Sequence, residues 1–310
     1  MVTEALPARP DIARVRSENG VIRESAGYRV FRVANAIVLL LVCIVTLYPF
    51  LNLVAKAFSS EGYIAAGKVN LIPMGFNVDT FAVVLGDGMF WRNYGNTLLF
   101  TVVGTFISMA LTTTYAYALS RPHLKGKGFF VGIAVFTMFF GGGLIPNYIL
   151  VASFLGWRNS IWAVVVPGAL SVFNLLVMKS FFENFPAELE EAAAIDGLST
   201  YGIFFRIVLP LSKAVLATMT LFYAVAQWNS WFSAFLYLDN KSLFPVTVYL
   251  RNLIAAATGT QDAGAAADAV QISANIQSVT MLLTVLPIIC LYPFIQRYFV
   301  SGVMLGSVKG

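Results

Sequence analysis

The feature that most constrains this chain is a set of six long segments without a single Asp, Glu, Lys, Arg or His. Each is 18 to 25 residues long. An α-helix of that length crosses the hydrocarbon core of a bilayer, which is about 30 Å thick. Composition agrees, because 58% of the 310 residues are hydrophobic and only 11% are charged. We therefore predict an all-α integral membrane protein with six transmembrane helices, at residues 33–55, 96–119, 129–153, 161–178, 214–238 and 276–295.

The positions of the basic residues predict which loops face the cytoplasm, because translocating a positively charged loop is disfavoured. Fourteen of the twenty Lys and Arg residues lie in the N-terminal tail, in the second and fourth loop regions and near the C-terminus. The tails 1–32 and 301–310 are therefore predicted to be cytoplasmic, on either side of a permease domain at 33–300. The loops 56–95 and 239–275 are then predicted to face outward.

Several other classes of protein are disfavoured by the same residues. The net charge of +5 comes from Lys and Arg next to the apolar segments, so it does not indicate a nucleic-acid partner. Cys43 and Cys290 lie inside apolar segments and are interpreted as small fillers. The first apolar segment follows a 32-residue polar tail and is too long for a signal peptide, which predicts a retained membrane anchor.

Two of the predicted transmembrane helices contain residues that interrupt a helix. The third has glycines at 141–143 and Pro146, and the fourth has Pro167-Gly168. A broken helix is tolerated in a membrane only where the freed backbone groups meet protein or water. We expect these two helices to line a cavity or to bend against their neighbours, and close packing through small residues is an equal alternative.

The outward loops differ in character. Glycines punctuate residues 56–95, which predicts a small lid or docking surface. The loop 239–275 begins with aromatic and apolar residues that predict a short surface helix, and its Gly- and Ala-rich second half predicts an irregular loop.

A polar stretch at 185–213, between the fourth and fifth apolar segments, predicts two short helices joined by a hinge. Pro186 suits the first turn of a helix, and the Glu residues after it lie near the positive end of the helix dipole. Alanines at 192–194 keep the next turn narrow, so that another protein can approach closely. Asp196-Gly197 supplies a left-handed residue to end the helix.

The second half of this helix-turn-helix segment is apolar. Tyr201, Phe204, Phe205 and Val208 recur at the spacing of one helical face, and Pro210 is expected to end the helix. We expect this helix to be buried against the inner ends of the transmembrane helices. A push on the first short helix would then reach the fourth and fifth transmembrane helices.

The segment also carries a motif whose full spacing resembles the EAA loop of permease subunits from binding-protein-dependent bacterial ABC importers. Gly197 follows the Glu-Ala-Ala triplet by four residues, and the Ile comes ten residues later. The chain's last residues, 292–300 and 306–310, are similar to the carbohydrate-uptake branch, the MalG-like subunits and their LplC- and YtcP-type relatives. The resemblance covers nearly the whole chain. The motif residues are Glu191, Ala192, Ala193, Gly197, Ile207, Leu209 and Pro210.

The resemblance implies a type I ABC importer permease fold and a multi-pass protein of the bacterial cytoplasmic (inner) membrane. It implies a heterodimer with a second, MalF-like permease, two ABC ATPase subunits that use ATP and Mg, and an extracytoplasmic sugar-binding protein. The 239–275 loop would reach the binding protein, and the tail 301–310 would approach the ATPases. This chain itself would bind no cofactor.

The resemblance also assigns roles within the helix-turn-helix segment. The expected ATPase contacts are Glu191, Ala192, Ala193, Asp196 and Gly197. Ile207, Leu209 and Pro210 would support them from behind, beside the apolar residues Tyr201, Phe204 and Phe205.

The residues that would line a path for a sugar through the membrane are indicated less clearly than those of the EAA motif. Asn174, Gln227, Trp228 and Asn229 lie in or near predicted helices and could offer hydrogen bonds or a stacking face to a sugar. Hydrogen bonds between helices explain each of them equally well.

The main alternative is an ion-coupled secondary sugar transporter. Such proteins generally need ionisable or specially placed polar groups within the membrane, and the six uncharged segments argue against a proton relay. Sodium sites built from carbonyl oxygens would escape this argument.

An enzyme is disfavoured by a single His and by the absence of HExxH and GxSxG, so no catalytic or metal-binding residue is predicted. The chain also lacks a GxxxxGK[ST] phosphate loop, so ATP must be hydrolysed by another chain. The prediction is an ATP-driven oligosaccharide import permease.

Overall fold

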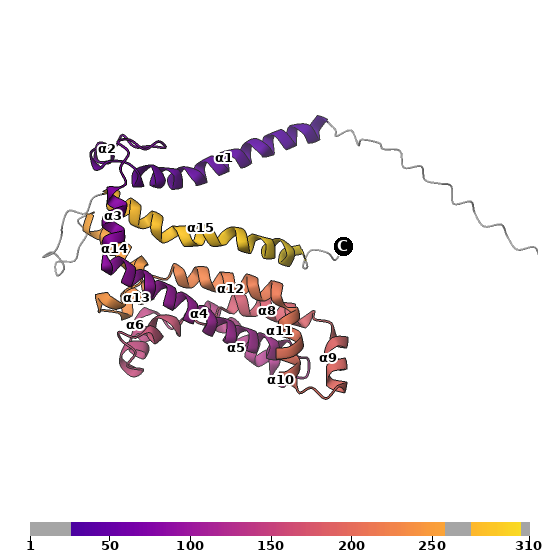
Figure 1. The fold of residues 1–310 in the computed structure, drawn as a ribbon. Helices are drawn as coiled ribbons and strands as arrows, with labels where there is room; N and C mark the ends of the chain where they lie inside the picture. Colours follow the sequence, from indigo (N-terminus) through magenta and orange to yellow (C-terminus); the bar gives the residue numbers. More distant parts are fainter. Residues whose placement is uncertain (1–25, 258–273, 305–310) are drawn as a thin grey trace, which may run out of the picture. The chain divides into compact units, whose positions relative to one another are not determined.

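A computed structural model describes the backbone of residues 26–257 and 274–304, which in these ranges is helical or irregular and forms no strand (Figure 1). The chain divides into two compact units, residues 1–50 and 51–310. Helix α1 (Ala26–Ala57) contains the first predicted transmembrane segment and continues from the first unit into the second. The predicted cytoplasmic tails lie almost entirely outside the described residues.

Two described helices are long and apolar enough to cross a membrane unaided, at Gly27–Ala57 and Gly88–Ser120. Two bent pairs raise the number to four. Lys127–Phe139 and Leu144–Phe154 meet at 112°, and Thr200–Leu211 and Lys213–Trp228 meet at 83°. The chain is therefore rich in membrane-spanning helices, and the count of six stays a prediction.

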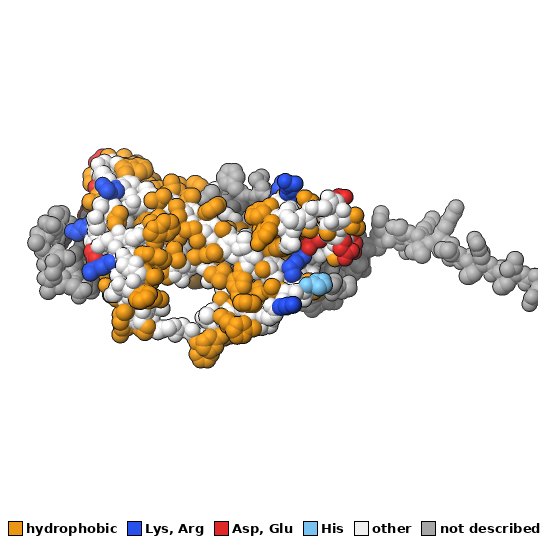
Figure 2. Space-filling model, turned by 90° about the horizontal axis from the view of Figure 1, so that it is seen from below, with side chains coloured by type: hydrophobic (Ala, Val, Ile, Leu, Met, Phe, Trp, Pro, Cys, Tyr) orange, Lys and Arg blue, Asp and Glu red, His pale blue; other side chains and the backbone are white. Residues whose placement is uncertain are grey.

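The central helix of the second unit is α4 (Gly88–Ser120). Helices α8 (Val172–Glu183) and α12 (Lys213–Trp228) both pack along α4, and α15 (Ala274–Met304) packs along α12 (Figure 1). Figure 2 shows hydrophobic side chains across the middle of one face of the molecule and charged side chains toward its two ends. This distribution is typical of a protein whose middle lies in lipid.

Helix α4 begins earlier than the sequence predicts. Residues 88–95 were expected to belong to the outward loop, but they form the first two turns of α4. The carboxylate of Asp87 caps the helix by accepting a hydrogen bond from the Met89 N–H at 2.8 Å. Because of this cap, the loop ends at Asp87 rather than at Gly95. The remaining loop contains the short helices α2 (Glu61–Ala65) and α3 (Asp79–Gly86).

The predicted interruptions of the third and fourth transmembrane segments are confirmed. The third consists of α5 (Lys127–Phe139), a break at 140–143, α6 (Leu144–Tyr148) and one wide π-helical turn, Ile149–Phe154. The fourth consists of α7 (Ile161–Val165) and α8. At this second break the freed Ser171 N–H donates to the Tyr223 hydroxyl of α12 at 3.1 Å. Protein groups thus satisfy the backbone where the helix is interrupted.

The prediction of one continuous helix over 214–238 was wrong. Helix α12 ends at Trp228, and a separate helix, α13 (Phe232–Tyr237), follows a short break. At this end of the helix the Val225 carbonyl accepts hydrogen bonds from both the backbone N–H of Asn229, at 3.1 Å, and its side-chain amide, at 2.8 Å. Trp228 and Asn229 therefore lie at the end of α12 rather than deep inside a helix.

The outward loop after α13 contains a short 3-10 turn (Lys241–Leu243) and helix α14 (Val246–Ala257), which confirms the predicted short helix. The predicted irregular loop after it lies outside the described residues. Thr97 of α4 accepts a hydrogen bond from the Val246 N–H at 2.7 Å, and Asp87 pairs with Tyr249 at 2.8 Å. These bonds attach α14 to the beginning of α4.

The helix-turn-helix segment lies near the other end of α4. Its elements are α9 (Ala187–Ile195), α10 (Thr200–Ile203), a wide π-helical turn (Phe204–Val208) and α11 (Leu209–Leu211). The two predicted short helices and the hinge between them are thus present.

Candidate functional site

Helix α9 ends in the left-handed glycine that the sequence predicts. Gly197 has a φ of +81°, and its N–H donates to the Ala194 carbonyl at 3.0 Å. The Leu198 N–H donates to the Ala193 carbonyl at 3.0 Å, which completes a Schellman motif. No atom lies within 4 Å of the place that a Cβ would take on Gly197. The backbone conformation, and not a lack of space, therefore requires glycine here.

Helix α9 has a buried face and an exposed face, which divide the Glu-Ala-Ala triplet. Ala193 is only 4% exposed and lies in an apolar cluster that also contains Phe182 of α8 and Phe204. Glu191 and Ala192 are exposed, and so is Ile195, at 87%. One alanine of the motif therefore serves packing within the chain, and the other is available to a partner.

Arg121, just after α4, holds α9 in place. Its guanidinium forms an ion pair with Glu190 of α9 and donates to the Phe182 carbonyl of α8 at 3.0 Å. The guanidinium carbon also lies 4.5 Å from the centre of the Tyr117 ring. One side chain thus joins α4, α8 and α9. In the sequence, Arg121 is one of the basic residues of the second loop region that indicate membrane orientation; its position directly after a long uncharged helix was the available signal for its further role.

A second ion-pair group lies at the same end of the molecule. Glu183, the last residue of α8, accepts hydrogen bonds from Lys127 of α5 at 2.7 Å and from Lys179 at 2.8 Å. These two ammonium groups lower the pKa of the Glu183 carboxyl. The Lys127–Glu183 ion pair ties the start of α5 to the end of α8.

The predicted buried face of the second short helix was partly wrong. Tyr201 is 78% exposed and Phe205 is 59% exposed, whereas Ile203, Phe204 and Val208 are buried. The buried residues, with half-buried Ile207, lie on the helical face next to the predicted one. Both faces of this helix carry large apolar side chains, so periodicity alone did not decide which face packs against the apolar cluster.

The remaining motif residues lie where the sequence suggested. Ile207 and Leu209 are half-buried and pack against the same apolar cluster. Pro210 is exposed, and the helix stops one residue later, at Leu211. Support of α9 by Ile207 and Leu209 is consistent with this packing.

The residues suggested for a sugar path do not share one surface. Trp228 is buried, and its indole N–H donates to the Thr284 carbonyl of α15 at 3.1 Å. Asn229 bonds to its own helix, and Asn174 is buried in the first turn of α8. Gln227 packs against Gly104 of α4.

Comparison with known proteins gives the family. No family model matches the chain. Protein LplC of Bacillus subtilis (strain 168) is 40% identical over 283 residues, which cover 91% of this chain and 96% of that protein. The polygalacturonan/rhamnogalacturonan transport system permease protein YtcP of the same strain is 38% identical over 276 residues, which cover 88% of this chain and 96% of that protein.

A solved structure agrees. The chain matches a crystal structure of a bacterial ABC transporter involved in the import of the acidic polysaccharide alginate, with a TM-score of 0.80 and 31% identity. The match covers 89% of this chain and 99% of that chain. The chain belongs to the permease subunits of carbohydrate ABC importers, which are multi-pass proteins of the inner membrane. Its relatives are transport permeases, which supports a transport subunit rather than an enzyme.

Proposed function

We propose that this chain carries an oligosaccharide into the cell, and that ATP hydrolysis on two separate ATPase subunits drives the transport. A second, MalF-like permease and an extracytoplasmic sugar-binding protein complete the transporter. ATP and Mg are used by the ATPases, since this chain has no phosphate loop. The observation that supports this proposal best is the two-faced helix α9, which has a buried anchor on one side and exposed motif residues on the other.

The exposed face of α9 is the proposed ATPase contact. Glu191, Ala192 and Ile195 are exposed there, and Ala192 is small enough for another protein to approach the helix backbone closely. Asp196 and Gly197 are exposed at the end of the same helix.

The buried face of α9 is the proposed route for force. Ala193 and Glu190 attach α9 to α4 and α8, and close-packed side chains transmit a displacement instead of absorbing it. The helix-turn-helix segment also continues through α11 into α12. A movement of the ATPases would therefore reach α4, α8 and α12 together, and would change which side of the membrane the sugar path faces.

The relatives support an acidic glycan as the cargo. YtcP, at 38% identity, is named for polygalacturonan and rhamnogalacturonan, and the alginate importer matches at 31%. A relative named for arabinooligosaccharides is less similar, at 27% identity. We propose an oligosaccharide released from an acidic polysaccharide, such as an oligogalacturonide.

Co-purification tests this proposal most directly. The chain is expressed with its genomic neighbours, and the complex is reconstituted into proteoliposomes with the binding protein. We expect an ATPase and a second permease to co-purify, and we expect ATP-dependent uptake of a tritiated oligogalacturonide above that of an arabinooligosaccharide. Uptake by this chain alone, driven by an ion gradient, would contradict the proposal.

Glu191→Lys tests the coupling surface in the same system. The variant should insert and fold, because the side chain is exposed, but oligosaccharide uptake should be lost. Normal uptake by Glu191→Lys would refute the assignment of α9.

A further inference from the structure

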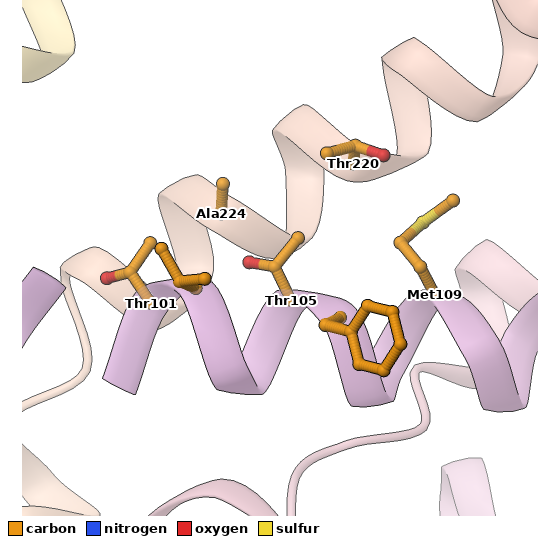
Figure 3. Close-up of a pocket in the computed structure, with 7 residues that line it drawn as sticks. Thr101, Thr105, Met109, Thr220 and Ala224 are labelled. Atoms are coloured by element: carbon orange, nitrogen blue, oxygen red, sulfur yellow. The ribbon is translucent and has the colours of Figure 1, made fainter. Parts of the chain in front are cut away.

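A pocket of about 410 Å³ lies between α4 and α12, and its wall is almost entirely apolar (Figure 3). Thr101 and Thr105 belong to its lining, but their hydroxyl oxygens are buried inside the chain and do not reach a ligand. A small-molecule site needs placed polar groups as well as apolar contacts. This pocket therefore offers nothing that selects a sugar, and the charged groups at the outward end of the chain are better placed to do so.

Helices α13 and α14 pack against each other at the end of the second unit opposite α9 (Figure 1). Ala234 of α13 and Val248 of α14 are fully buried in one apolar cluster. The Thr247 hydroxyl of α14 also donates to the Ser230 carbonyl, just before α13, at 3.2 Å. These contacts fix the two helices together, so the side chains on their remaining faces keep a constant arrangement.

Three exposed aromatic side chains lie on α13 and directly before it, at Trp231, Phe232 and Phe235. The ring centres of Trp231 and Phe232 are 5.5 Å apart, and those of Trp231 and Phe235 are 6.1 Å apart. Trp231 and Phe235 are four residues apart in the sequence, which places them on one side of α13. Together these rings form an accessible apolar surface.

Arg251 of α14 adds a positive charge to this aromatic surface. Its guanidinium carbon lies 3.9 Å from the centre of the Phe235 ring and 5.7 Å from that of the Trp231 ring, so cation–π attraction holds it in place. Its one hydrogen bond to the described residues is long, from Nη1 to Asn252 Oδ1 at 3.4 Å, and it forms no ion pair with them. A guanidinium carries five N–H donors, and stacking on a ring leaves those at its edge free. The charge is thus oriented, and most of its donors are unused.

Other arginines at this end of the chain are already engaged. Arg158 forms an ion pair with Asp239 at 2.7 Å, and Arg92 donates to the Ser242 carbonyl at 3.1 Å. Arg251 differs from both, because its main contacts in the described structure are aromatic rings.

A uronate unit of an acidic oligosaccharide has the chemistry that matches this surface. Its carboxylate accepts two parallel hydrogen bonds from a guanidinium, and the C–H groups of its ring pack on an aromatic face. A neutral sugar would use the rings but would leave the guanidinium without a counter-charge. The acidic cargo proposed above also has to pass the outward end of the chain as it enters.

We propose that Arg251 binds the carboxylate of a uronate unit at the outward end of this chain, while the neighbouring Trp231 packs against the sugar ring. Phe235 is a positioning residue, since it holds the guanidinium. The inference rests on the proposed function and deepens it, because it names the group by which this chain selects an acidic cargo.

The test compares ATP-dependent uptake of a tritiated oligogalacturonide with that of its methyl ester, which has the same rings and no charge. The ratio of acid to ester uptake is measured in the reconstituted complex with one binding protein, whose own preference is then the same for every variant. We expect Arg251→Gln to lower this ratio about tenfold, the effect of losing a charge-assisted hydrogen bond. Arg251→Lys keeps the charge without the paired donors, so its ratio should lie between the two.

Lys241→Gln is the matched control. It removes one positive charge from an exposed position of the same outward loop and should leave the ratio unchanged. Trp231→Leu should lower uptake of acid and ester by a similar factor, because both forms have the ring that packs on Trp231.

Three results would overturn the uronate site. The first is an unchanged ratio with Arg251→Gln, as expected if Arg251 faces lipid headgroups. The second is an equal fall with Lys241→Gln, which would indicate a general attraction by positive charge. The third is that Arg251→Gln needs more binding protein for half-maximal stimulation of ATP hydrolysis, which would show that Arg251 contacts the binding protein.

In all three cases the unmodified complex still takes up the acid, so the proposed function stands without the site. If the unmodified complex takes up neither form with ATP, the proposed function itself fails, and the uronate site fails with it.

Discussion

Arg121 is the residue on which the position of α9 depends most. Its side chain is 25% exposed and that of Glu190 is 16% exposed, so removing either partner leaves a half-buried charge unpaired. We predict that Arg121→Gln or Glu190→Gln destabilises the inner end of the permease by about 1–3 kcal/mol and weakens the coupling of ATP hydrolysis to uptake. Thermal unfolding of the purified complex and the ratio of sugar moved to ATP hydrolysed measure the two effects.

The double variant Arg121→Gln/Glu190→Gln provides the control for this pair. With both charges gone, no unpaired charge remains, so part of the lost stability should return. If the two single variants were as stable as the unmodified protein, Arg121 would not anchor α9.

Because of the ion pairs of Glu183, we predict that the stability of the folded protein depends on pH. Its pKa is lowered in the folded protein, first by the Lys127 hydrogen bond and then by that of Lys179. The contribution of these ion pairs is therefore complete at neutral pH, and it is lost as the pH falls through the folded-state pKa. We predict that Glu183→Gln lowers stability by about 0.5 kcal/mol at pH 7.

The difference between Glu183→Gln and the unmodified protein should disappear at an acidic pH below the lowered pKa of Glu183, where both side chains are neutral. Thermal unfolding at the two pH values measures it. An equal effect of Glu183→Gln at both pH values would show that packing, not charge, is responsible.

At the scale of a single element, the two faces of α9 give a matched pair of variants. Ala193→Leu inserts extra volume into the apolar cluster and should destabilise the permease by about 1–3 kcal/mol. Ala192→Leu adds the same atoms on the exposed face and should leave stability unchanged, while it blocks approach of the ATPase. Unfolding temperature and recovery of the ATPase on purification separate the two effects. Equal ATPase recovery with Ala192→Leu would argue against docking at this face.

The hinge after α9 gives a second prediction at this scale. Gly197→Val places a β-branched residue at φ +81° and should cost more than about 1–2 kcal/mol, because the left-handed conformation crowds its Cβ against the backbone. Gly197→Asn should be tolerated, since Asn adopts this conformation more readily. Transport assays should show uptake lost with Val and largely kept with Asn. The reverse order would mean that side-chain contacts, not backbone conformation, select glycine.

At the scale of the whole molecule, α4 links the two ends of the second unit. Its first turns contact α14 through Thr97 and Asp87, and Arg121 at its other end holds α9. A helix of 33 residues spans about 50 Å. One rigid helix therefore connects the proposed ATPase contact with the predicted outward face.

This architecture predicts the energy source of transport. Sugar uptake into proteoliposomes that contain the full complex should require ATP and should continue when protonophores or sodium ionophores remove all ion gradients. The complex without its ATPase subunits is the control and should transport nothing. Loss of uptake on adding an ionophore would favour the ion-coupled alternative.

The sequence by itself determined the features of this protein that depend on local chemistry. The uncharged segments predicted helices in lipid, since charge is costly there. Gly197 and the breaks at 141–143 and Pro167-Gly168 were predictable, because glycine and proline act through the backbone of their own neighbourhood. The spacing of the motif around Glu191 indicated the family for the same reason: it is contained in one short segment.

The tertiary structure alone decided what depends on contacts between distant segments. It paired Arg121 with Glu190, gave Trp228 a partner on α15, and left Tyr201 and Phe205 exposed. It also showed which threonines of α4 lack a hydrogen-bond partner in the described structure. The periodicity of apolar residues in a sequence predicts the faces of an isolated, regular helix. The direction in which a side chain finally points is fixed by the helices packed around it, because burial and hydrogen bonding are satisfied jointly across the fold.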